Sequence, residues 1–153
     1  MKTVVLITCT KNKHTGKHRA EYLYTKSDDF VKYLECARAI TDNQDIFVIS
    51  ALHKLVPLYK EIEWYDFTLK GRAKEENEKW GSEVIAQIGE LYDVNTTKFI
   101  IIADEDYYTA LEAHLPYMDA PLKGIGCGPQ GYEQLDEYVQ EFLQKRSKAP
   151  EDF

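Results

Sequence analysis

Short apolar runs alternate with longer amphipathic stretches along most of the chain. Runs rich in aliphatic and β-branched residues occupy 2–9, 45–51 and 98–103, and a weaker run occupies 122–125. Runs of this length between polar residues are typical of strands buried on both faces of a parallel sheet. The pattern therefore predicts about four strands.

Apolar residues recur at helical spacing between and after these runs. The helical pattern covers 27–41, 72–92, 106–114 and 132–145. Ser27 and the two acidic residues after it are a typical helix start, because the hydroxyl caps free N–H groups and the acids favour the helix dipole. Strands alternating with helices predict a small doubly wound, Rossmann-like α/β fold, with about four mainly parallel strands and helices on both faces.

The chain has the length of one domain. Its 153 residues are 44% hydrophobic and 29% charged, which is typical of a soluble globular protein. No linker or internal repeat divides residues 1–146, so we expect them to form a single α/β domain. Residues 147–153 are polar and are expected to form a flexible C-terminal tail.

The sequence also limits where the protein is expected to act. Its apolar runs are far shorter than the about 20 residues that a membrane span needs, and no signal-peptide cleavage site is evident. The three cysteines form no CxxC pair, which favours reduced thiols over a disulfide framework. We therefore expect a cytoplasmic protein that has no membrane partner, while its oligomeric state is not defined by the sequence.

Basic residues concentrate near the N-terminus. The whole chain carries a net charge of −7, but residues 1–26 contain six Lys/Arg and one acidic residue and carry +5, so the remainder carries −12. An acidic surface disfavours tracking along duplex DNA, because non-specific affinity comes mainly from neutralised phosphates. A local basic loop remains suited to one phosphate or a short single strand.

The loop after the first predicted strand combines cations with hydroxyl groups. Its candidate ligand-binding residues are Thr8, Thr10, Lys11 and Lys13. Charge-assisted hydrogen bonds from such groups hold phosphate or carboxylate. The loop has neither a P-loop nor a dinucleotide-binding motif, so no nucleotide class follows from a motif, and a solvated basic loop is the alternative.

Cys9 and His53 each follow a predicted strand and have reactive side chains. Cys9 is a candidate nucleophile if Lys11 or His14 stabilises its thiolate, and an inert buried thiol is the alternative. His53 is a candidate general base or ligand anchor, and otherwise an ordinary hydrogen-bonded polar residue.

Two further segments at predicted strand ends have suitable chemistry. Trp64 and Tyr65 next to Asp66 suit base stacking with a general acid or base, although capping of the core and a turn explain them as well. Gly126 lies in a glycine-rich run, where backbone freedom and the next helix N-terminus suit an anion. The four scattered histidines and the isolated acids at 104–106 indicate no metal site, and no cofactor is expected.

The sequence resembles a family of small bacterial and phage proteins known chiefly as a domain of unknown function. The resemblance covers nearly the whole chain and is carried by the segments LITCTKNK, EYLYTKSDDFVKYLECA, IFVISALHKLVPL, EIEWYDFTL and LKGIGCGPQGYEQL. The chain departs from the family pattern at Lys54, where the family has Gly, and at Trp64, where it has Pro. The matching positions include Cys9, Lys11, Lys13, Tyr24, Ser50, His53, Tyr65 and Asp66.

This family is in turn similar to the YaaA-like peroxide-stress proteins, which bind DNA, and to domains of archaeosine-type tRNA-modifying enzymes. The resemblance implies nucleobase or nucleic-acid chemistry. We therefore hypothesise an enzyme that cleaves or exchanges an N-glycosidic bond of a nucleotide or nucleic acid, of the glycosylase or lyase kind. The alternatives are a non-catalytic nucleotide-binding module, such as a sensor or a phage sequestering protein, and a DNA-binding protein.

The hypothesis assigns a role to each group of candidates. Asp66 stabilises the oxocarbenium charge or activates water, and His53 protonates the leaving base. Lysines and hydroxyls of the first loop hold phosphate. The base stacks on Tyr24, Trp64 or Tyr65, and Cys9, Ser50 and Gly126 complete the set.

Overall fold

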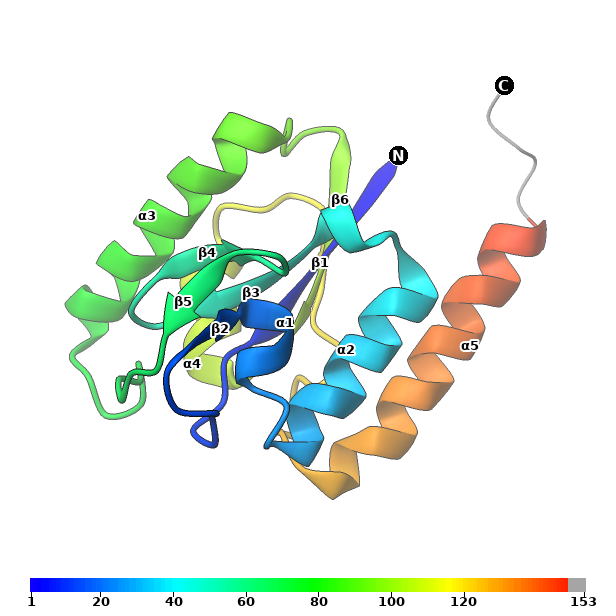
Figure 1. The fold of residues 1–153 in the computed structure, drawn as a ribbon. Helices are drawn as coiled ribbons and strands as arrows, with labels where there is room; N and C mark the ends of the chain where they lie inside the picture. The colour runs from blue at the N-terminus through cyan, green and yellow to red at the C-terminus, as the bar shows by residue number, and fades with distance from the viewer. Residues whose placement is uncertain (149–153) are drawn as a thin grey trace.

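A mixed sheet of five strands forms the centre of the computed structural model, which describes residues 1–148 (Figure 1). Its strand order is β4-β3-β1-β6-β7. The three central strands, β1 (Lys2–Thr8), β3 (Ile46–Ser50) and β6 (Thr97–Ile102), run parallel. β4 (Lys54–Pro57) pairs antiparallel with β3, and β7 (Met118–Asp119) pairs parallel with β6.

Helices cover both faces of this sheet. α2 (Asp28–Ile40) and α5 (Tyr132–Lys148) pack on one face, while α3 (Lys74–Leu91) and α4 (Glu105–Glu112) pack on the other (Figure 1). In α2 the side chain of Ser27 accepts a hydrogen bond from the N–H of Phe30, which is the expected N-cap. The doubly wound α/β fold predicted from the sequence is confirmed.

The alternation of side chains along the central strands divides the core into two layers. Val5 and Ile7 of β1 face the layer with α2 and α5, and Val4 and Leu6 face the layer with α3 and α4. All four side chains are fully buried. Strands covered on both faces need apolar residues at every position, which explains their uninterrupted hydrophobic runs.

A second, smaller sheet lies in the segments that follow β1 and β4. β2 (Lys17–Arg19) pairs antiparallel with β5 (Glu61–Glu63), and the short helix α1 (Ala20–Leu23) follows β2. The pairing joins the basic loop after β1 to the aromatic segment around residue 64. Two single-turn 3₁₀ helices, Asn43–Asp45 and Pro129–Gly131, complete the elements.

Two expectations about the strands are wrong. Residues 122–125 form turns, because Gly124 adopts a left-handed conformation (φ 82°) that a regular strand does not allow; the strand of this region is β7. No strand was predicted between residues 51 and 98, but a tight turn after β3 leads into β4, with Lys54 at a φ of 64°. The sheet therefore has five strands where about four were predicted.

The C-terminal segment was expected to be a flexible tail from residue 147. α5 extends through Lys148, and residues 149–153 lie outside the described part of the chain. Within residues 1–148, no helix combines the length and the apolar character that crossing a membrane requires.

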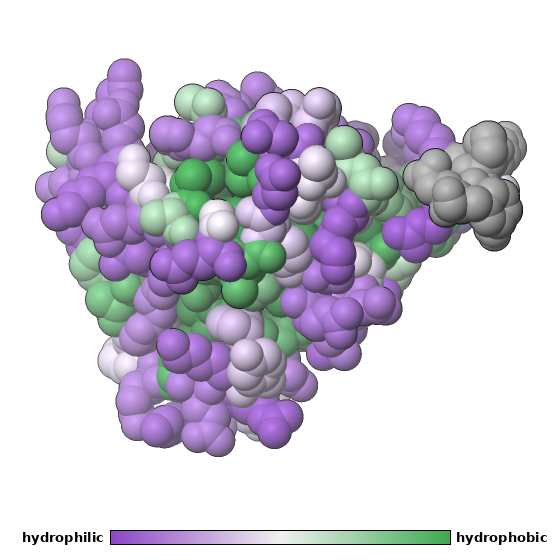
Figure 2. Space-filling view, turned by 90° about the horizontal axis from the view of Figure 1, so that it is seen from above, coloured by the Kyte–Doolittle hydropathy of each residue, from purple (hydrophilic) through white to green (hydrophobic). Residues whose placement is uncertain are grey.

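Hydrophilic and hydrophobic residues separate clearly on the face shown in Figure 2. Hydrophilic residues cover most of its outer parts, and hydrophobic residues gather toward its middle. This distribution is the one expected of helices that turn charged faces outward around a layered apolar core.

Candidate functional site

A pocket of ≈ 590 Å³ opens beyond the carboxyl ends of β1 and β6. β1 lies between β3 and β6, and the chain continues from β1 to α2 on one face of the sheet and from β6 to α4 on the other. Such a switch point leaves a crevice at the sheet edge, and ligands of open α/β sheets bind there. We call this hollow the main pocket.

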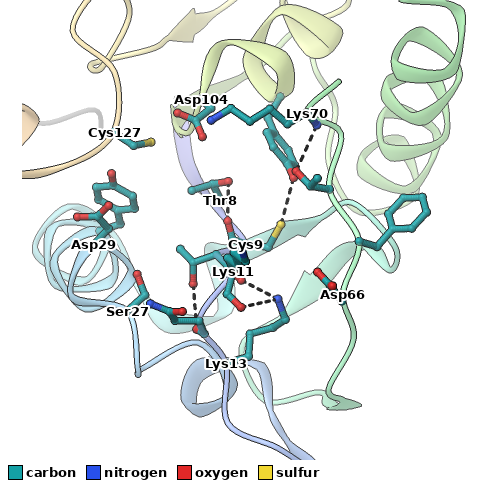
Figure 3. Close-up of a pocket in the computed structure, with 16 residues that line it drawn as sticks. Thr8, Cys9, Lys11, Lys13, Ser27, Asp29, Asp66, Lys70, Asp104 and Cys127 are labelled. Carbon is teal, nitrogen blue, oxygen red and sulfur yellow. Dashed lines mark hydrogen bonds between the residues drawn. The ribbon is translucent and has the colours of Figure 1, made fainter. Parts of the chain in front are cut away.

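Five segments distant in the sequence form the main pocket (Figure 3). They are the loop after β1, the first turns of α2, the segment after β5, the start of α4, and the glycine-rich run. The lining residues are Thr8, Cys9, Thr10, Lys11, Asn12, Lys13, Ser27, Asp29, Tyr33, Asp66, Phe67, Thr68, Lys70, Asp104, Tyr107 and Cys127.

The loop after β1 is folded around the ammonium group of Lys13. Its Nζ donates hydrogen bonds to the carbonyl oxygens of Thr10 (2.9 Å) and Lys11 (3.1 Å), and it lies 4.7 Å from the ring centre of Tyr65. Lys13 is only 7% exposed. Burial lowers the pKa of this lysine, while Cys9 and Asp66 act in the opposite direction.

Charged groups of both signs line the main pocket without pairing. Its lysines are Lys11, Lys13 and Lys70, and its carboxylates are Asp29, Asp66 and Asp104. Every ion pair in the described residues joins side chains outside this lining. In Figure 3 the side chain of Lys70 reaches across the pocket toward Asp104. Lys11, Lys70 and Asp66 have neither an ion pair nor a side-chain hydrogen bond among the described residues and remain available to a ligand, whereas Asp29 accepts a hydrogen bond from the hydroxyl of Tyr132.

The two thiols of the pocket are in different surroundings. The Sγ of Cys9 lies 3.4 Å from the hydroxyl of Tyr107, whose pKa is raised mainly by burial, so the phenol keeps its proton at neutral pH. Burial also raises the pKa of Cys127 to about 12, and Asp104 adds to this effect. Cys127 is therefore a neutral thiol at physiological pH.

A buried hydroxyl network lies behind Lys13. The hydroxyls of Tyr24 and Tyr65 are 2.6 Å apart, and the hydroxyl of Ser50 donates to that of Tyr65 over 2.7 Å. The N–H of His53 donates to the Ser50 hydroxyl, and the His53 ring meets the Tyr65 ring edge to face at 5.1 Å. The network anchors the Tyr65 ring against which the Lys13 ammonium rests.

Half of the candidate residues predicted from the sequence line the main pocket. These are Thr8, Cys9, Thr10, Lys11, Lys13 and Asp66. They come together because the loop after β1 and the segment after β5 are joined through β2 and β5.

The other candidates lie elsewhere. Tyr24 and Ser50 are 0% exposed and Tyr65 is 6% exposed, so neither tyrosine has the open ring face that base stacking needs. His53 does not line the pocket; its Nε2 is buried without a hydrogen-bond partner, and burial lowers its pKa. Trp64 is exposed beside the main pocket. Gly126 lines a neighbouring hollow of ≈ 410 Å³ instead.

Several lining residues were not among the predicted candidates. Ser27 and Asp29 had been assigned only to the start of a helix, and Asp104 only to a group of acids that indicates no metal site. No functional role was predicted for Lys70 or Tyr107. A signal was available for all of these residues except Lys70, because they lie near a strand end or at the start of a helix that faces the switch point.

No group of three or more His, Cys, Asp and Glu side chains within residues 1–148 is arranged to hold a metal ion. The arrangement suits charge-assisted binding of a small anionic ligand, with the carboxylate of Asp66 free for proton transfer.

Comparison with known proteins gives a family and no named relative. Residues 4–135 match a family described as a family of unknown function, DUF6884. No curated protein and no solved structure matches the chain.

Proposed function

We propose, from the premise that this chain belongs to DUF6884, a family of unknown function, that its main pocket binds a nucleotide and cleaves or exchanges the N-glycosidic bond. The substrate is a nucleotide or another nucleobase-containing molecule with a phosphate. The proposal includes a relationship to YaaA-like and archaeosine-type domains, which the motif residues suggest.

One observation carries the proposal: the lysines and carboxylates of the main pocket form no ion pairs with one another among the described residues. Charged side chains that serve stability are normally paired, whereas unpaired charges in a crevice are typical of binding sites. The volume of ≈ 590 Å³ falls in the range of pockets for small molecules.

The positions of the charges suggest how a nucleotide binds. Lys11 and Lys70 are exposed lysines on opposite segments of the pocket, and they suit the phosphate. Thr8 and Thr10 add hydroxyl groups beside them. Lys13 uses two of its three N–H donors on backbone carbonyls and keeps one for the ligand.

Asp66 is the residue to which we assign the chemistry. It has no hydrogen bond or ion pair within the described chain, and it lies on the same side of the pocket as Lys13 (Figure 3). In hydrolysis the bond between the sugar C1′ and the base nitrogen breaks, and its electron pair leaves with the base. Asp66 stabilises the positive charge at C1′ and accepts the proton of the attacking water.

The leaving base must take up a proton, and Lys13 is placed to supply it. Its lowered pKa makes its ammonium a stronger acid than an ordinary lysine. We assign this role to Lys13 in preference to His53, because Lys13 lines the main pocket and His53 does not.

The proposal is tested by mass-spectrometric detection of free base after incubation with a panel of nucleotides and short oligonucleotides. We expect the wild-type protein to release a base from at least one of them, and Asp66→Asn to lower the rate by about 10²- to 10⁴-fold. Asp42→Asn is the matched control, because Asp42 is exposed, lies outside the pocket and makes no side-chain hydrogen bond. Equal rates for Asp66→Asn and the wild type would remove the role of Asp66.

A binding module without chemistry is the second candidate, and the exposure of Asp66 favours it. A reacting carboxylate is usually shielded from bulk water, whereas Asp66 is exposed. In this case the same panel yields a bound nucleotide but no free base, and Asp66→Asn changes the affinity alone.

A further inference from the structure

A second hollow of ≈ 440 Å³ lies directly beside the main pocket. Four of its lining residues, Lys11, Asn12, Lys13 and Asp66, also line the main pocket. The two residues that belong to it alone are Lys26 and Trp64. We call it the outer hollow; because of the shared wall, one ligand can occupy both spaces.

Trp64 offers the outer hollow an open aromatic face. Its side chain is 48% exposed, and no aromatic or cation–π contact of residues 1–148 includes it. The other aromatic side chains predicted to stack a base, Tyr24 and Tyr65, are buried. An exposed indole costs free energy in water unless a partner covers it.

The backbone holds Trp64 in place. Its N–H donates a hydrogen bond of 3.0 Å to the carbonyl oxygen of Gly16, and it follows β5, where Glu63 pairs with Lys17 of β2. The stacking residue and the basic loop therefore belong to one hydrogen-bonded unit. A stacking surface held in this way loses little entropy when a base binds.

Positive charge lies between the two hollows. Lys11 and Lys13 line both of them, and Lys26 extends the basic lining on the outer side. Among the described residues none of these lysines forms an ion pair. A phosphate at this junction would join a ring system in the main pocket to a second one on Trp64.

We infer, on the basis of the proposed function, that the ligand is a dinucleotide: one nucleotide occupies the main pocket, the linking phosphate lies at Lys11 between the two hollows, and the second base stacks on Trp64 in the outer hollow. Two linkages share this chemistry, the 3′,5′-phosphodiester and the 5′,5′-pyrophosphate. The acidic remainder of the chain favours a short ligand of this kind over a long nucleic acid.

Calorimetric titration of the full chain tests the inference. The probes are AMP, GMP, CMP and UMP, and for each base the phosphorylated 3′,5′-dinucleotide and the 5′,5′-pyrophosphate dinucleotide. We expect one dinucleotide class to bind roughly 5- to 150-fold more tightly than its mononucleotide, the gain that stacking of one base provides. The class that gains identifies the linkage.

Variants separate stacking from other effects. Trp64→Ala should remove the gain and leave the mononucleotide affinity unchanged, while Trp64→Phe should retain part of it. Tyr59→Ala is the control, since Tyr59 is 69% exposed and lines neither hollow. Because Trp80 is buried, fluorescence quenching by the dinucleotide should come from Trp64 and should be lost in Trp64→Phe.

The outcomes distinguish this inference from the proposed function. If mononucleotides bind but dinucleotides bind no more tightly, or if Trp64→Ala binds dinucleotides as the wild type does, the outer subsite is refuted and the proposed function stands. If none of the nucleotides binds, the proposed function itself is refuted, and the dinucleotide inference with it.

Discussion

Lys13 is a buried lysine that both holds the loop after β1 and lines the main pocket. Burial of an ammonium group is costly, and hydrogen bonds to two carbonyls and contact with the Tyr65 ring offset only part of the cost, as its lowered pKa indicates. The ammonium therefore holds the loop after β1 in shape, and its one remaining N–H donor is the group that the proposed function uses.

The variant Lys13→Met should change the pH dependence of folding. Between the lowered pKa of folded Lys13 and 10.5, the unfolded chain binds more protons, so this group makes the free energy of unfolding rise with pH in that window. Lys13→Met should lack this rise. Urea denaturation of both proteins from pH 7 to 10.5 measures it, and parallel profiles would contradict the assignment.

The same substitution should weaken binding of the best nucleotide of the panel by about tenfold or more, because a charge-assisted hydrogen bond is lost. Lys17→Met is the control, since Lys17 is exposed and lines neither hollow. Isothermal titration calorimetry compares the two variants, and an equal loss in both would show that only overall charge matters.

The sequence predicts correctly which residues line the main pocket where their position along the backbone is sufficient. Lys11 and Lys13 follow β1 and line the pocket, as the rule for open α/β sheets predicts, and Asp66, which follows β5 of the second sheet, lines it as well. Tyr24 and Tyr65 also lie near this edge, but their side chains point into the core. Neither the spacing nor the residue type of these tyrosines indicates their direction, because an aromatic ring suits both positions.

At the scale of elements, the contact between α3 and α4 depends on one glycine. A Cβ atom at Gly81 would lie 2.3 Å from the carbonyl oxygen of Ala110, so the helix backbones approach too closely for any side chain. Gly89 lies two turns further along α3 with no atom within 4 Å of its Cβ position. The close contact of α3 with α4 therefore requires a glycine at position 81 but not at position 89, so replacing the two glycines should have opposite effects on stability.

We expect Gly81→Ala to destabilise the protein by about 1–3 kcal/mol or more, because α4 must move away from α3. Gly89→Ala should stabilise it by about 0.5–1 kcal/mol, since alanine favours an exposed helix position. Chemical denaturation of both variants measures the difference. Effects of the same sign would mean that α3 and α4 do not pack as described.

The elements that the sequence predicts well are those buried on both faces or amphipathic over several turns. β1, β3, β6 and the longer helices belong to this group. Edge strands such as β4 and β7 were missed because they have four and two residues and lack a periodic pattern long enough to detect. Their existence depends on pairing with a neighbour, which is a tertiary effect.

At the scale of the whole molecule, buried phenols and thiols make the fold sensitive to alkali. Burial raises the pKa of Tyr24 and Tyr65 above the usual value, and that of Cys36 to about 11 from 9.0. In the window between the unfolded and the folded pKa the unfolded chain has lost more protons, so stability falls as pH rises.

Titration of the native protein above pH 9 should therefore show unfolding together with ionisation of the buried tyrosines. Tyrosinate absorbance and circular dichroism measure the two processes, and the urea-unfolded chain, which ionises near pH 10, is the reference. Full tyrosinate formation with unchanged circular dichroism would contradict the burial of these side chains.

The central claim is that the main pocket binds a nucleotide with its glycosidic bond at Asp66. A crystal structure of the protein with the best-binding mononucleotide, soaked at a concentration that saturates it in solution, tests the claim most directly. We predict the phosphate beside Lys11 and Lys70 and the sugar C1′ facing Asp66. A nucleotide bound at any other surface, with the main pocket left to solvent, would contradict the claim.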